Sequence, residues 1–227
     1  MSTETPRIVG IDVARGFAIL GMFIAHAIPR ADESELLVDG RSSILFATLA
    51  GVSLGIMTGS EHPLDRGRRG DRVVSIVLRA IVLFVLGVIL SLLGSEIAVI
   101  LDYYAIMFLL LTPVLFLPRW ALAALGGMLV AVAPAVATAV GDASPATPPL
   151  IYFLHYYLLS GYYPVLIWLP FLLAGLIAAR SGLDNSRTQF WMVAAGTFSA
   201  VLGYGAAGVL PGVTAEEHSG TTAEVLG

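Results

Sequence analysis

The sequence predicts an all-α fold, a polytopic bundle of about seven transmembrane helices with its N-terminus in the cytoplasm. Three observations predict it. In composition, 57% of the 227 residues are hydrophobic and 12% are charged, whereas a soluble domain is roughly half apolar and about a quarter charged. Apolar windows of about 20 residues, the length that spans a bilayer, recur along the chain. Finally, basic and acidic loops alternate.

Seven windows have the length and hydropathy of a membrane span. The mean hydropathy of the whole chain is +0.88, and no internal repeat divides it, so we treat residues 1–227 as a single transmembrane domain. Polar linkers are expected at residues 29–40, 60–72 and 141–149, and a polar tail is expected from Pro211. The predicted spans are residues 8–28, 42–59, 73–93, 97–117, 120–140, 163–179 and 190–209.

Residues 150–164 (LIYFLHYYLLSGYYP) are apolar but short, and Gly161 and Pro164 interrupt them. Tyrosines crowd the segment, which predicts an interfacial helix on the outer side of the membrane. If the segment enters the bilayer, it is a re-entrant element beside a cavity. His155 lies among these tyrosines and belongs either to an aromatic interface belt or to a binding site in which aromatic faces stack on a ligand.

Charge alternates from loop to loop in the way that the positive-inside rule requires of a chain with a cytoplasmic N-terminus. One set of loops carries Arg7, Arg66, Arg68, Arg69, Arg72, Arg119, Arg180 and Arg187. The other set carries Asp32, Glu33, Glu35, Asp39, Glu96, Asp142, Glu216 and Glu217, with only Arg30 and Arg41 as basic members. Hydropathy and charge therefore agree on the topology.

The first span also resembles a signal peptide, because residues 16–25 form a short apolar core and residues 25–27 have the small-x-small shape of a cleavage site. Asp12 argues against cleavage, since it lies where a signal peptide carries basic residues. We therefore expect an uncleaved first helix.

Three polar residues share one face of this first span. Arg15 and His26 are separated by about 20° around the axis and roughly 16 Å along it, and Asp12 lies within about 60° of both. A charged group in the bilayer costs about 2.5–3.5 kcal/mol on insertion scales and normally faces a bundle interior or a wet cavity. Asp12 and Arg15 could simply pair at the interface, and His26 could hydrogen-bond to a neighbouring helix. Together the three predict a functional site.

Arg15 and His26 form an R-x(10)-H pattern within GIDVARGFAILGMFIAH. This pattern resembles the first helix of the acyltransferase type 3 family. Residues 7–22 (RIVGIDVARGFAILGM), 41–59 (RSSILFATLAGVSLGIMTG) and 218–227 (HSGTTAEVLG) are more closely similar to the bacterial relatives of heparan-alpha-glucosaminide N-acetyltransferase, including the YeiB-like group. The likeness is strongest over residues 7–59 and weak in the third to sixth predicted spans. Relatives tend to be longer, so we expect that this chain lacks further C-terminal spans.

The resemblance implies a multi-pass enzyme of the bacterial plasma (inner) membrane and cell envelope. Such an enzyme moves an acetyl or other acyl group from cytoplasmic acyl-CoA to a glycan or glycolipid acceptor on the far side. It implies that His26 acts as general base or as nucleophile. Arg15 then binds a phosphate or carbonyl of CoA, oriented by Asp12. A homodimer is an expectation from the resemblance alone.

One departure from the family pattern bears on His26. The eukaryotic enzyme has asparagine at the matching position, and its proposed catalytic histidine lies in the following loop. Residues 29–40 contain no histidine here. Either His26 carries the chemistry, as in the acyltransferase type 3 pattern, or another residue does.

Other candidates lie outside the first span. Asp102, inside the fourth span, needs a partner, for which we expect an arginine or a catalytic group. His218, beside two glutamates, is a second general-base candidate. Arg41 is either an interface anchor or a contact for substrate or the thioester oxygen. Arg68 and Arg69 belong to a basic cluster that serves mainly as a topology signal and otherwise attracts the CoA phosphates.

Several functional classes find little support. The chain has no cysteine, shows no zinc-ligand spacing and offers no nucleic-acid surface, so we expect neither a metal nor a nucleic-acid partner. The main alternative is a proton- or ion-coupled transporter or flippase that uses Asp12, Arg15, Asp102 and His26. A non-catalytic membrane scaffold is a third class. Dependence on acyl-CoA separates the enzyme from both.

Overall fold

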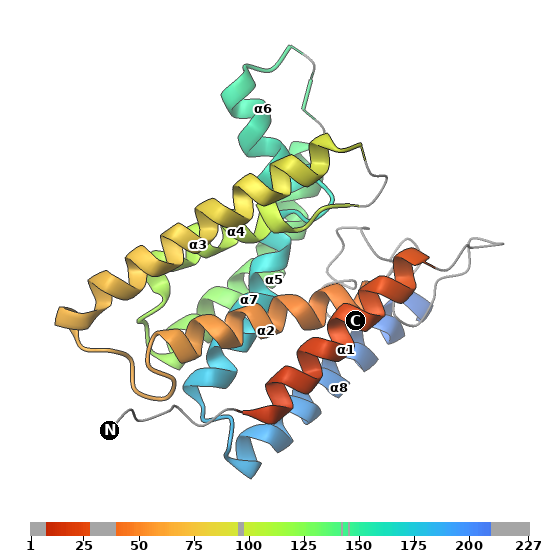
Figure 1. Ribbon diagram of the computed structural model, residues 1–227. Coiled ribbons are helices and arrows are strands. Elements are labelled where there is room, and N and C mark those ends of the chain that lie inside the picture. The colour runs from red at the N-terminus through yellow and green to blue at the C-terminus, as the bar shows by residue number, and fades with distance from the viewer. Residues whose placement is uncertain (1–7, 28–39, 95–97, 142, 145, 210–227) are drawn as a thin grey trace.

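The computed structural model describes residues 8–27, 40–94, 98–141, 143–144 and 146–209, and of residues 203–209 it describes the backbone alone. All regular structure in these ranges is helical (Figure 1). The elements are α1 Val9–Ala27, α2 Arg41–Met57, α3 Arg66–Leu92, α4 Leu101–Leu111, the 3-10 turn η1 Thr112–Val114, α5 Arg119–Val140, α6 Pro149–His155, the π turn η2 Tyr156–Ser160, α7 Val165–Arg180 and α8 Ser186–Val209.

Each of the seven predicted spans overlaps a helix, although the fourth, residues 97–117, corresponds only to α4 and η1 over residues 101–114. The described residues contain no strand, which confirms the all-α fold class. Among the described residues, α1, α3 and α5 are long and apolar enough to cross a membrane. The number is four if α6–η2 and α7, bent by 52°, form one broken span. Helices α2 and α4 are apolar but shorter. The count of seven spans and the cytoplasmic N-terminus stay predictions.

Helix α7 forms the centre of the fold. It packs against α2, α5 and α4, while α3 packs on α4 and α1 packs on α2 (Figure 1). Small residues bring α2 and α7 together, because a Cβ atom at Gly51 would overlap the Leu172 carbonyl and one at Gly175 would overlap that of Thr48. Membrane helices use small residues spaced four apart for such close packing. The segment GVSLG (residues 51–55), which contributes to the family resemblance, supplies the α2 side of this contact.

A buried arginine joins the C-terminal end of α7 to the C-terminal end of α2. Arg180 was assigned to a cytoplasmic loop, but it is the last residue of α7 and only 5% exposed. Its guanidinium donates to the Thr58 hydroxyl at 2.7 Å and the Leu115 carbonyl at 2.9 Å. It also donates to the carbonyls of Gly55 and Ser60. A cation there complements the partial negative charge at the C-terminus of α2.

Helix α3 begins earlier than predicted. The predicted linker at residues 60–72 is therefore wrong over its second half, because α3 starts at Arg66 and contains the arginine cluster in its first two turns. A helix of 27 residues is about 40 Å long at 1.5 Å per residue, which exceeds the roughly 30 Å hydrocarbon core. The polar first turns can lie outside the core, and a hydropathy window detects only the apolar remainder.

Candidate functional site

The polar face of α1 contacts α2. Arg15 donates to a carboxylate oxygen of Asp12 at 3.3 Å and to the hydroxyl of Ser53 on α2 at 3.1 Å. Ala18 and Gly21, the two buried residues of α1, allow the close approach. The predicted pairing of Asp12 with Arg15 is therefore present. Ser53 is the additional partner, which spacing within one helix does not reveal.

His26 lies in the last turn of α1. Its side chain is exposed, and no hydrogen bond joins it to any residue that the structure describes. Arg15 is instead hydrogen-bonded to Asp12 and Ser53, although Asp12, Arg15 and His26 share a helix face. The site on α1 therefore has two parts. Toward the start of the helix, Arg15 is hydrogen-bonded to Asp12 and Ser53, and at its end the imidazole of His26 is accessible.

Asp102 lies in the first turn of α4 and is 5% exposed. The expected arginine partner is not found in the described part of the chain. Instead, the hydroxyl of Tyr157, from the π turn after α6, donates to Oδ2 of Asp102 at 2.8 Å. Oδ1 has no partner among the described residues. Asp102 therefore belongs to a tyrosine cluster and is not joined to Arg15 or His26.

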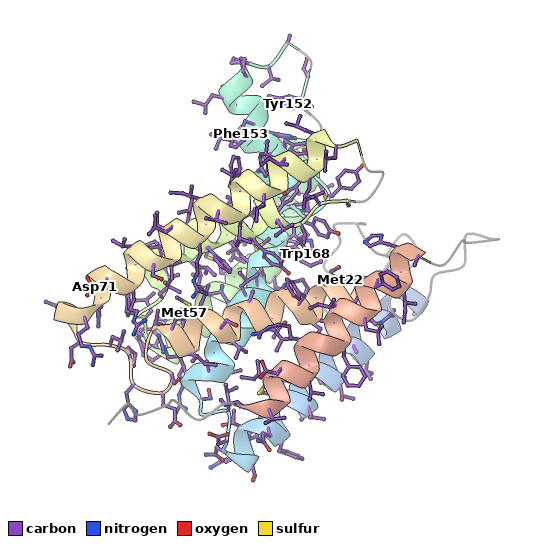
Figure 2. All side chains as sticks on the ribbon, viewed as in Figure 1. Met22, Met57, Asp71, Tyr152, Phe153 and Trp168 are labelled. Carbon is purple, nitrogen blue, oxygen red and sulfur yellow. The ribbon has the colours of Figure 1, made fainter. Side chains whose placement is uncertain are left out.

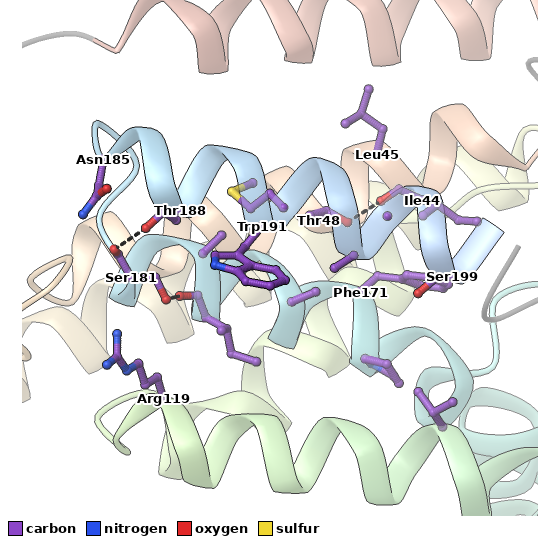
Figure 3. Close-up of a pocket in the computed structure, with 18 of the residues that line it drawn as sticks. Ile44, Leu45, Thr48, Arg119, Phe171, Ser181, Asn185, Thr188, Trp191 and Ser199 are labelled. Carbon is purple, nitrogen blue, oxygen red and sulfur yellow. Dashed lines mark hydrogen bonds between the residues drawn. The ribbon is translucent and has the colours of Figure 1, made fainter. Parts of the chain in front are cut away.

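A cavity of about 1090 Å³ opens between α2, α5, α7 and α8 (Figure 3). We call it the α8 groove. Arg119, Arg187, Asn185 and Thr188 line it where α5 and α8 begin. Its middle is apolar and aromatic, and it extends to Arg41 at the start of α2. The apolar lining includes Ile44, Leu45, Pro170, Phe171, Ala174, Ile177, Trp191 and Met192.

The three arginines outside α1 that the sequence analysis assigned to acyl-CoA binding separate into two groups. Arg41 lines the α8 groove, but Arg68 and Arg69 do not. Arg68 is exposed on the first turn of α3. Arg69 donates to the Leu64 carbonyl at 2.8 Å, and its guanidinium lies 4.6 Å from the centre of the Phe116 ring. These contacts give Arg69 a structural role where α3 meets the turn after α4. His218 lies outside the described residues.

The sequence analysis did not identify two of the groove residues as candidates for ligand binding. Arg119 and Arg187 were interpreted only as topology signals, because each precedes a predicted span. Both side chains are exposed, and neither forms an ion pair within the described ranges. They are 68 positions apart by their residue numbers, so no local pattern relates them. The one feature of the sequence that could have indicated them is that each arginine lies at the start of an apolar helix.

The described residues contain no group of three or more histidine, aspartate or glutamate side chains that could hold a metal ion. In comparisons with known proteins, a family model described as "Heparan-alpha-glucosaminide N-acetyltransferase, catalytic" matches residues 7–207. The match includes α1 to α7 and nearly all of α8. No curated protein and no solved structure matches the chain.

Proposed function

The chain belongs to the heparan-alpha-glucosaminide N-acetyltransferase catalytic family, and we propose from this premise that it acetylates an extracytoplasmic acceptor using cytoplasmic acetyl-CoA. We place it in the plasma (inner) membrane of a bacterium, with a glycan or glycolipid as acceptor. Beside the family match, the observation that carries this proposal is the α8 groove, which has Arg119 and Arg187 at one end, Arg41 at the other and apolar side chains between them.

The groove suits an acyl-CoA donor. The phosphates of CoA are anionic, and guanidinium groups bind phosphate through paired hydrogen bonds. Arg119 and Arg187 supply such groups at the end that the charge pattern assigns to the cytoplasm. The pantetheine arm would then extend past Phe171 and Trp191. Arg41, which lines the opposite end of the groove, would polarise the thioester carbonyl.

The polar residues of α1 supply the proton chemistry. In direct transfer, the imidazole of His26 removes a proton from the acceptor amine or hydroxyl, which attacks the thioester carbonyl carbon. The carbon–sulfur bond breaks, and the CoA thiolate leaves and takes up a proton. In the two-step alternative, His26 itself accepts the acetyl group and passes it to the acceptor. Asp12 and Ser53 hold Arg15 beside α2 in either case.

The double variant Arg119→Gln/Arg187→Gln tests the donor site. We expect the KM for acetyl-CoA to rise about 10-fold or more, since a hydrogen bond to a charged group contributes about 1.5–3 kcal/mol, while kcat changes little. The measurement is acetyl-CoA turnover by purified protein in lipid nanodiscs with glucosamine as acceptor. Arg72→Gln, an exposed arginine outside the groove, is the matched control. An unchanged KM would refute the groove as donor site, and wild-type protein without turnover would refute the activity.

A further inference from the structure

We propose that one face of α3 binds phosphatidylethanolamine, a phospholipid with a primary ammonium group, through Arg79, Ser75 and Asp71. None of these residues lines the α8 groove or contributes to the contacts of the α1 site. The lipid site is therefore independent of the proposed acetyl transfer. Three features of α3 point to it: an arginine within its apolar part, a groove that contains this arginine, and the order of the polar groups along the helix.

Arg79 is the middle residue of the 27-residue helix α3. It is also the single charged residue in the predicted span at residues 73–93. A charged residue within a span normally faces the bundle interior or a wet cavity. The side chain of Arg79 is instead exposed, and no carboxylate within the described ranges forms an ion pair with it. An arginine in this position requires a polar or anionic partner from outside the described fold.

A groove of about 650 Å³ lies along this face of α3. Asp71, Ser75 and Arg79 line it, and because they are spaced four residues apart they lie on one side of the helix. Figure 2 shows Asp71 near the start of α3, at the edge of the molecule. The groove combines these three polar groups with a hydrocarbon wall. That wall consists of Val74, Leu78, Val82 and Leu83 of α3 and Phe108 of α4.

Arg79 and Ser75 form the phosphate-binding part of the groove. Helical side chains lean toward the N-terminus of their helix, so the guanidinium of Arg79 extends toward the turn that carries Ser75. The Ser75 hydroxyl has no hydrogen-bond partner in the part of the chain that the structure describes, whereas those of Thr48 and Ser53 in α2 donate to carbonyls one turn earlier. A lipid phosphate can accept from both a guanidinium and a hydroxyl.

The order of the groups along α3 matches the order of the groups in this lipid. Asp71 lies one turn closer to the start of the helix than Ser75, about 6 Å along the axis. Its exposed carboxylate is therefore nearer the headgroup layer than the phosphate-binding pair. In phosphatidylethanolamine the ammonium lies beyond the phosphate and can donate to such a carboxylate. The acyl chains would extend in the opposite direction, past Val82 and Phe108.

A second copy of the chain fits this face less well than a lipid does. Two copies inserted in the same orientation are related by an axis along the membrane normal, so their α3 helices would pack in parallel. Arg79 would then face Arg79 of the other copy, and like charges repel strongly where the dielectric is low. A lipid phosphate supplies the opposite charge.

The test measures binding of three dioleoyl phospholipids to the full chain in detergent by native mass spectrometry. The lipids are phosphatidylethanolamine, phosphatidylcholine and phosphatidylglycerol. We expect wild-type protein to bind phosphatidylethanolamine about 5-fold more tightly than the others, since a trimethylammonium group cannot donate to Asp71 and glycerol carries no cation. Arg79→Gln should weaken phosphatidylethanolamine binding about 10-fold. Asp71→Asn should keep phospholipid binding and abolish the preference for phosphatidylethanolamine.

Arg66→Gln and Asp184→Asn are the matched controls, because both residues are exposed and neither lines the groove. Arg66 lies on α3 about 140° around the helix axis from Arg79, and Asp184 lies in the turn before α8. Both variants should bind the three lipids as the wild type does. Arg79 and Asp71 are exposed as well, so their variants should unfold at the wild-type temperature.

Three results would overturn the lipid site. The first is folded Arg79→Gln protein that binds phosphatidylethanolamine as tightly as the wild type. The second is wild-type protein that binds phosphatidylcholine or phosphatidylglycerol as tightly as phosphatidylethanolamine. The third is a lipid-free wild-type dimer that Arg79→Gln dissociates, which would assign this face to a second copy. These measurements use neither acetyl-CoA nor an acceptor, so failure of the proposed acetyl transfer leaves their outcome unchanged.

Discussion

Replacing His26 with alanine is expected to lower the rate of acetyl transfer about 10²-fold or more, the contribution that a positioned general acid–base commonly makes. His26 is the exposed histidine of the α1 site, and no described residue is hydrogen-bonded to its ring. Its removal should therefore reduce kcat and leave the thermal stability of the protein unchanged. The measurement is kcat with labelled acetyl-CoA and glucosamine in nanodiscs.

His62→Ala is the matched control, because His62 is also exposed but lies in the turn before α3. We expect this variant to retain wild-type kcat. Acetyl transfer by His26→Ala at the wild-type rate would exclude His26 as base and as nucleophile. Trapped acetyl-protein in the wild type that disappears in His26→Ala would distinguish the nucleophile from the base.

Replacing Arg180 with alanine is expected to destabilise the fold by about 1–3 kcal/mol, the cost of leaving buried hydrogen-bonding groups without their partner. The guanidinium joins the end of α2, the turn after it and Leu115 beyond η1. Without it, the Thr58 hydroxyl and the carbonyls lose a charged donor in a buried environment. The measurement is the midpoint of thermal unfolding in detergent, together with the yield of monodisperse protein.

Arg72→Ala is the control for this variant, since Arg72 is an exposed arginine on the first turns of α3 that contributes the same topological charge. It should unfold at the wild-type temperature. If Arg180→Ala and Arg72→Ala gave the same midpoint and yield, Arg180 would be a topology signal only, as its position in the sequence first indicated.

Much of the fold could be predicted from the sequence because membrane helices are detectable from a single local property, the length of an apolar window. The helix pattern follows from it, including the short helical segment α6–η2 within residues 149–160. The interfacial position of that segment stays a prediction. The positions of the helix ends were predicted less accurately. Arg66 and Arg180 were both placed in loops, because hydropathy cannot separate a solvated arginine from one that continues a helix or neutralises a helix end.

The candidate site could be predicted only where it lies within one helix. The pair Asp12–Arg15 follows from the three-residue spacing, but the contact with Ser53 depends on how α1 packs on α2. Asp102 was identified as a buried carboxylate in need of a partner, whereas Tyr157 lies 55 positions away in a segment whose π turn has no recognisable pattern. The α8 groove likewise depends on the packing of four helices.

The most direct test of the central claim is vectorial acetyl transfer in sealed proteoliposomes. Acetyl-CoA carrying a labelled acetyl group is added outside, and glucosamine is enclosed inside, so that only molecules with their cytoplasmic face outward can act. We predict labelled N-acetylglucosamine in the lumen, dependent on the protein and independent of an ion gradient. Labelled acetyl-CoA that is left unconsumed by intact, folded protein, with no labelled sugar in the lumen, would contradict the account.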